Sequence, residues 1–185
     1  TGCSQTNEAA SVGGFKISQT DLQASIDAVI AERAKVDTTQ MQLETGEELN
    51  RGQLRFKILM HTFDEIAKEL KIDVTSSQIG AKKATILESV GGEAELPKNL
   101  VNAAIALQDF DTYVRAIVIS EQISQALSQS GVTDEEVSAK VSELLTAKAK
   151  TLGVKINPRY GAWDNEAGDV VAANVTGDAV KPSDK

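Results

Sequence analysis

The feature that most constrains the fold of this chain is a long apolar stripe in the segment 47–71. Large apolar side chains recur there, mostly three or four positions apart: Leu49, Phe56, Leu59, Phe63, Ile66 and Leu70. Because an α-helix has 3.6 residues per turn, this spacing places them on one side of a helix. At 1.5 Å per residue such a helix is about 37 Å long. The stripe therefore predicts a helix that is long for a protein of 185 residues.

Five further helices are predicted from local start and stop signals. Three of them begin after a hydroxyl residue that suits an N-cap: Ser18, Thr75 and Thr133. Thr75 and Thr133 are followed three positions later by Gln78 and Glu136, which completes a capping box. The predicted helices cover residues 19–36, 47–71, 76–91, a short segment from residue 96, 110–130 and 134–152.

Two short segments near the chain ends alternate between apolar and polar residues, which is typical of strands. They are residues 15–17, after Gly13 and Gly14, and residues 154–157, before Pro158. A lone strand leaves its backbone groups without hydrogen bonds, so we expect these two strands to pair. The predicted fold class is therefore mainly α (α+β), with about six helices and a short two-stranded pairing between the N- and C-terminal strands.

The chain ends differ in composition from this helical part. Residues 1–11 are mostly small and polar, and residues from 164 onward are Gly, Asp, Asn, Ala and Val without a helical or strand period. Segments that cannot bury apolar surface remain disordered. We therefore expect a tether over residues 1–11, one helical domain over residues 12–163 and a disordered tail over residues 164–185.

The overall composition excludes several classes of function. The net charge of −8 argues against binding of nucleic acid, which needs a basic face. No apolar run reaches the roughly 20 residues of a membrane-spanning helix. Aromatic residues make up only 4% of the chain, so the core is expected to be aliphatic.

Cys3 is the only cysteine and cannot form an internal disulfide. It follows Gly2 and precedes a polar stretch, which resembles the end of a bacterial lipobox. That resemblance implies a diacylglycerol on Cys3, a mature chain that begins there, and a membrane contact through this lipid alone. The alternative is an exposed free thiol.

No set of residues for catalysis, metal binding or cofactor binding is found. His61 is the only histidine, which rules out a two-histidine metal site, and a structural role is expected for it. The acid pairs Glu47-Glu48 and Glu135-Glu136 lie at helix starts, where negative charge favours the helix dipole. The chain contains neither a phosphate-binding glycine loop nor the Gly-x-Ser-x-Gly pattern. We therefore expect a protein that is not an enzyme and carries no metal or cofactor.

Two apolar residues stand in a segment without helical periodicity, between the first two helices. Met41 and Leu43 are therefore candidates for contact with a polypeptide partner, and flexible methionines suit surfaces that accept many partners. Packing onto the long helix is the alternative. Tyr160 and Trp163 either line a groove or hold the C-terminal segment on the helical body, and the second interpretation is favoured.

Several segments follow one another in an order that can be compared with known protein families. They are Phe15-Lys16-Ile17-Ser18-Gln19-Thr20-Asp21-Leu22, Asp73-Val74-Thr75-Ser76-Ser77-Gln78-Ile79, Gly91-Gly92, Tyr113-Val114-Arg115 and Val132-Thr133-Asp134-Glu135-Glu136-Val137. In this order they resemble the N-terminal domain of the SurA/PrsA family of exported chaperones and parvulin-type foldases. The segment Val154-Lys155-Ile156-Asn157-Pro158-Arg159-Tyr160-Gly161-Ala162-Trp163-Asp164 resembles the end of actinobacterial lipoproteins of this type. The resemblance covers about residues 12–164.

The chain departs from the foldases of this family in one respect. In those proteins a prolyl isomerase domain follows the helix start near Val132, whereas here the last helix leads directly to the closing strand. The resemblance therefore implies a chaperone-like protein without catalytic activity, anchored by lipid to the outer face of the bacterial cytoplasmic membrane. Its partners would be unfolded or newly exported polypeptides. The alternative is an adaptor lipoprotein that binds one fixed partner in the cell envelope.

Overall fold

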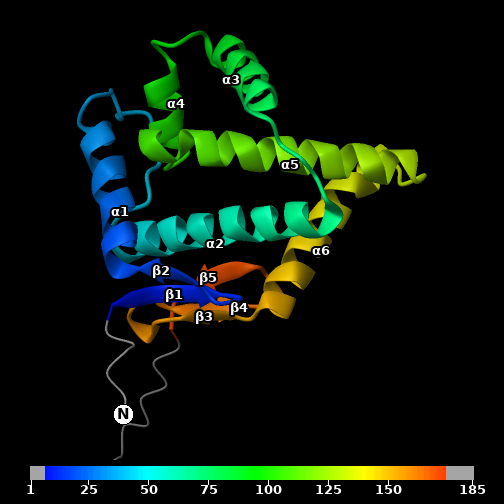
Figure 1. Ribbon diagram of the computed structural model, residues 1–185. Coiled ribbons are helices and arrows are strands. Elements are labelled where there is room, and N and C mark those ends of the chain that lie inside the picture. Colours follow the sequence, from blue (N-terminus) through cyan, green and yellow to red (C-terminus); the bar gives the residue numbers. More distant parts are fainter. Residues whose placement is uncertain (1–6, 174–185) are drawn as a thin grey trace, which may run out of the picture.

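The computed structural model describes residues 7–173, which form six α-helices and five short strands (Figure 1). The helices are α1 (Gln19–Arg33), α2 (Gly46–Leu70), α3 (Ser76–Val90), α4 (Leu96–Asn102), α5 (Phe110–Gln129) and α6 (Asp134–Leu152). The strands are β1 (Glu8–Val12), β2 (Phe15–Ser18), β3 (Val154–Ile156), β4 (Ala162–Asp164) and β5 (Asp169–Val171). The predicted mainly helical fold with a short strand pairing between the N- and C-terminal regions is confirmed, and the structure shows that this pairing is antiparallel.

Helix α2 lies at the centre of the molecule. In Figure 1 it runs between α5 on one side and the strands on the other, with α1 at one end and α6 at the other. Helix α3 packs on the far side of α5. Every other part of the fold is thus built around α2, directly or through α5.

Two apolar faces of α2 explain this position. The fully covered side chains of α2 are Leu49, Gln53, Leu54, Ile58, Thr62, Ile66 and Ala67. Of these, Leu54, Ile58, Thr62 and Ile66 follow one another at four-residue spacing and form one face. The predicted stripe is only partly correct, because Phe56, Leu59 and Phe63 are half-buried and Leu70 is 52% exposed. Phe56, Leu59 and Phe63 lie on a second face, which also carries the covered Leu49 and Ala67.

The predicted helix starts are confirmed by side-chain caps. The Ser18 hydroxyl accepts a hydrogen bond from the Asp21 N–H at 3.0 Å. In α3 the Gln78 N–H donates to the Thr75 hydroxyl at 3.2 Å, and the Thr75 N–H donates to the Gln78 side chain at 2.8 Å. These bonds satisfy backbone donors that the first turn leaves free, so the starts of α1 and α3 are encoded locally.

The first sheet has the order β2-β1-β3, with both pairs antiparallel. The predicted direct pairing of residues 15–17 with residues 154–157 is therefore wrong, because β1 lies between them. Residues 8–11, expected in the tether, belong to this central strand. Its side chains are small, and Ala9 and Ala10 are 0% and 3% exposed, so the strand lies close under α2. Small residues carry little strand propensity, which hid β1 in the sequence.

The C-terminal segment also departs from the prediction. Strands β4 and β5 form a hairpin, and Val170 is 5% exposed in the main core, so residues 164–173 are not a disordered tail. The Asp164 side chain accepts hydrogen bonds from the N–H groups of Glu166 and Ala167 and thereby closes the turn. Tyr160 and Trp163 pack against the same core, which confirms that they hold this segment on the body. The remaining predicted tail, residues 174–185, lies outside the described residues.

Gly161 allows the closest backbone approach in this hairpin. It has a φ of +125°, and a Cβ added there would lie 2.2 Å from the carbonyl oxygen of Val171. We expect Gly161→Ala to lower the free energy of unfolding by about 2–4 kcal/mol, because the strand must move and the residue is strained. Gly80, inside α3 with open space around it, is the matched control. Gly80→Ala should raise stability by about 1 kcal/mol in the same urea titration. Equal effects of the two substitutions would contradict this assignment.

Candidate functional site

The predicted contact residues Met41 and Leu43 lie in the segment between α1 and α2, and both are half-buried. Leu43 lines a cavity of about 360 Å³ against the second face of α2, where Phe56, Leu59 and Met60 lie. Tyr113 of α5 closes the far side of this cavity. Leu43 therefore packs beside the long helix and borders open space, and contact of Met41 and Leu43 with a polypeptide partner stays a prediction. Cys3 lies outside the described residues.

A second cavity, of about 320 Å³, lies between β2, α2 and α5, and we call it the β2–α2–α5 groove. Its apolar and aromatic lining consists of Phe15, Ile17, Phe56, Met60 and His61. The groove and the Leu43 cavity share Phe56 and Met60. The half-buried face of α2 thus continues from one hollow to the other.

Phe15 and His61 form an aromatic pair in the groove. Their rings are stacked, with centroids 4.1 Å apart and an angle of 14° between the ring planes. Phe15 remains 47% exposed, although it is large and apolar. An aromatic ring held in place by a stack and still open to solvent is suited to contact an apolar partner.

Burial in this groove lowers the pKa of His61 from its ordinary value, because desolvation disfavours the charged imidazolium. The charges of Glu65 and Asp64 act in the opposite direction, and that of Lys68 acts in the same direction. His61 is therefore held toward its neutral, less polar form. This favours an apolar groove surface at neutral pH.

Charged side chains border the apolar lining. Asp64 forms an ion pair with Arg115 at 2.8 Å, and the Asp109 carboxylate accepts a hydrogen bond from the Ser25 hydroxyl at 3.1 Å. Lys16 pairs with Glu8 on the outer side of the sheet. The groove is thus an apolar hollow with a mainly acidic border.

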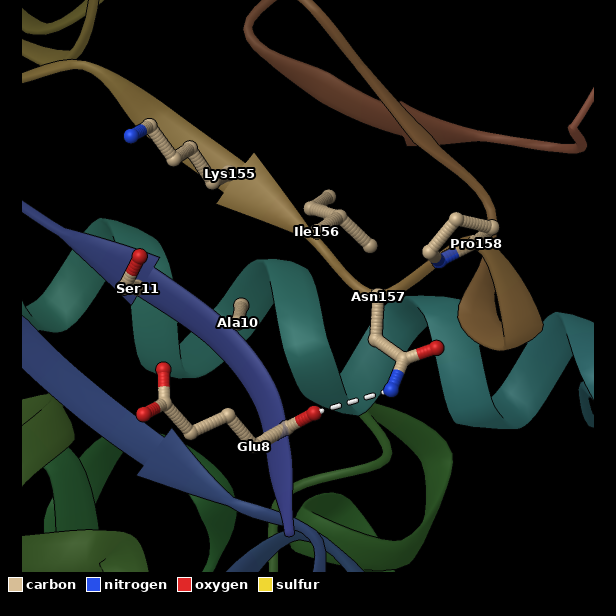
Figure 2. A pocket seen from close by; sticks show the side chains of 7 residues that line it. All are labelled: Glu8, Ala10, Ser11, Lys155, Ile156, Asn157 and Pro158. Atoms are coloured by element: carbon tan, nitrogen blue, oxygen red, sulfur yellow. Dashed lines mark hydrogen bonds between the residues drawn. The ribbon is translucent and has the colours of Figure 1, made fainter. Parts of the chain in front are cut away.

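The sheet carries a further hollow of about 250 Å³ between β1 and β3. Figure 2 shows Asn157 extending from the end of β3 to the main chain of β1, where its amide donates to the Glu8 carbonyl at 3.1 Å. The lining is largely main chain and polar side chains, including Ser11 and Lys155. We assign this hollow a structural role, because its defined contact joins the two strands.

Within residues 7–173, no group of three or more His, Cys, Asp or Glu side chains is placed to hold a metal ion. Helices long and apolar enough to cross a lipid bilayer are likewise absent from this range. Comparisons with protein-family models, with curated proteins and with solved structures found no match.

Sequence reasoning missed Phe15 and Met60 as site residues. Phe15 was assigned only to a strand, and Met60 was not singled out. A signal was present, since Met60 lies four residues after Phe56 and three before Phe63, on the predicted stripe. This spacing could not show which of these side chains would remain half-buried.

We expect His61 to make stability depend on pH. A folded-state pKa below the unfolded value means that acid favours the unfolded chain, so this contribution is present above about pH 6.5 and is lost as the pH falls through the folded pKa. The difference in unfolding free energy between the native protein and His61→Gln should therefore shrink between pH 7.5 and pH 5. Urea titrations at several pH values measure it. A difference that stays constant across this range would contradict the assignment.

Proposed function

We propose that this protein binds apolar segments of unfolded or newly exported polypeptides in the β2–α2–α5 groove, without chemical change to them. The observation that carries the proposal is the apolar hollow lined by the exposed Phe15 and the half-buried Phe56, Met60 and His61. Apolar contact of this kind is favourable in proportion to the area removed from water, and it does not depend on client sequence. The order of motifs that resembles the SurA/PrsA chaperone domain supports the same function.

We further propose that the protein acts outside the cytoplasmic membrane, attached through lipid on Cys3. Strand β1 begins at Glu8, five residues after Cys3, and five extended residues span at most about 17 Å. A lipid there would hold the sheet close to the bilayer surface. The groove would then face polypeptides that emerge at that surface.

The chaperone proposal is tested with a chemically denatured client whose aggregation is followed by light scattering. We expect the native protein to slow aggregation, and Phe15→Ser combined with Met60→Ser to weaken this protection about fivefold or more, because both side chains supply groove contacts. Leu70→Ser is the matched control, since Leu70 is 52% exposed at the other end of α2. It should leave the protection unchanged.

A second pair of substitutions, Met41→Ser with Leu43→Ser, shows whether clients bind in the β2–α2–α5 groove or in the Leu43 cavity. Loss of protection in this pair alone would move the site to the Leu43 cavity. A native protein that ignores several unrelated unfolded clients but captures one folded envelope protein would replace the proposal with the adaptor function.

The location is tested by metabolic labelling with a fatty-acid probe in the native host. We expect label on the native protein and none on Cys3→Ser, which should move from the membrane fraction to the soluble fraction. A native protein that is soluble and unlabelled would refute the lipid anchor.

A further inference from the structure

Strand β2 is an edge of the first sheet, because the strand order is β2-β1-β3. The two-residue turn Gly13-Gly14 joins it to β1, with Val12 opposite Phe15 and Ser11 opposite Lys16. In such a hairpin the pair next to the turn exchanges hydrogen bonds, and the next pair does not. The N–H and C=O of Lys16 therefore point away from β1, along the free edge. Among residues 7–173, the backbone bonds outside helices and ladders do not involve Lys16.

The groove lies beside this free edge. Phe15, Lys16 and Ile17 all line it, although the Lys16 amino group pairs with Glu8 on the outer side of the sheet. Since successive strand residues point to opposite faces, Phe15 and Ile17 face α2. One wall of the groove is thus the edge of β2, where the N–H and C=O of Lys16 can form hydrogen bonds with a partner. The floor of the groove is apolar.

The charges of the groove are complementary to a basic occupant. Of its three carboxylates, Asp64 is paired with Arg115, whereas Asp21 and Asp109 have no ion pair with any residue of the range 7–173. Lys16 is engaged by Glu8, which leaves Lys57 as the opposing cation. The free charges are thus two acids against one base, in a chain whose net charge is −8.

We infer that the groove takes an extended polypeptide segment as an additional strand on β2, with alternate apolar side chains in the groove and a lysine or arginine near Asp21 or Asp109. The inference rests on the proposed function and specifies its binding mode. Main-chain bonds to Lys16 supply affinity that is independent of client sequence, whereas the groove and its acids select the side chains. The edge has room for a short segment only, which suits weak and reversible binding.

The test uses a fluorescent peptide with threonine and valine or leucine in alternation and a lysine at each end. Its affinity for the native protein is measured by anisotropy, beside two peptides that are N-methylated at adjacent central positions. In an added strand only one of two adjacent N–H groups faces β2, so one methylated peptide should bind about tenfold more weakly and the other nearly as well as the parent. Equal binding of the two methylated peptides would overturn strand addition.

A protein variant tests the same bond from the other side. Lys16→Pro removes the free-edge N–H without loss of a bond to β1, and proline is tolerated on edge strands. Lys16→Ala is the reference, because it removes the same side chain and keeps the N–H. We expect the proline variant to bind the parent peptide several-fold more weakly than the alanine variant. Equal binding by two folded variants would overturn the inference, and if the proline variant does not fold, the methylated peptides decide.

The acids are tested with Asp21→Asn combined with Asp109→Asn. This variant should weaken the lysine-ended peptide several-fold at low salt and leave a glutamine-ended peptide unaffected. An unchanged preference for lysine would overturn the charge part of the inference. Protection of unfolded clients without strand addition leaves the proposed function standing, whereas absence of both protection and peptide binding refutes the two together.

Discussion

The burial of α2 is the constraint on which the rest of this structure depends. A helix of 25 residues with apolar side chains on two faces cannot be covered by one neighbour. The sheet and the C-terminal hairpin pack on the part of α2 that carries Leu49, Leu54 and Ile58, whereas α5 and α6 cover Ile66 and Ala67 near its C-terminal end (Figure 1). The groove lies where the second face runs between β2 and α5. The same helix therefore holds the core together and presents the candidate site.

The two ends of the described chain pair in the first sheet. The strand order that results determines which strand edge borders the groove. Strand β1 occupies the centre, so β3 covers one of its edges and β2 the other. Asn157 and the packed ring of Trp163 hold the C-terminal segment in place. Because β2 is left at an edge beside the groove, its main chain and its exposed Phe15 ring border the same space. A strand edge next to an apolar floor favours recognition of extended chains over recognition of a folded surface.

The local features of the fold could be predicted from the sequence. Helix starts at Ser18, Thr75 and Thr133 depend on side chains within four residues of the bonds they make. The end of α1 was placed three residues too late, at position 36 instead of Arg33, because no strong stop signal stands there. Strand β1 and the β4–β5 hairpin were missed for other reasons. Strand β1 was missed because most of its residues are small, with low strand propensity, and β4 and β5 because each has only 3 residues, too few to show an alternating pattern.

The sequence by itself determined the number of helices, their start positions and the absence of a recognisable catalytic motif, because these follow from short-range spacing and residue type. Only the tertiary structure decided which side chains of α2 became fully covered, because the elements that cover them come from distant parts of the chain. It also decided that Phe15 stacks on His61, because these residues come from elements that are distant in sequence. The candidate site is therefore a property of packing: it is the apolar surface that remains exposed after every available element has been placed against α2.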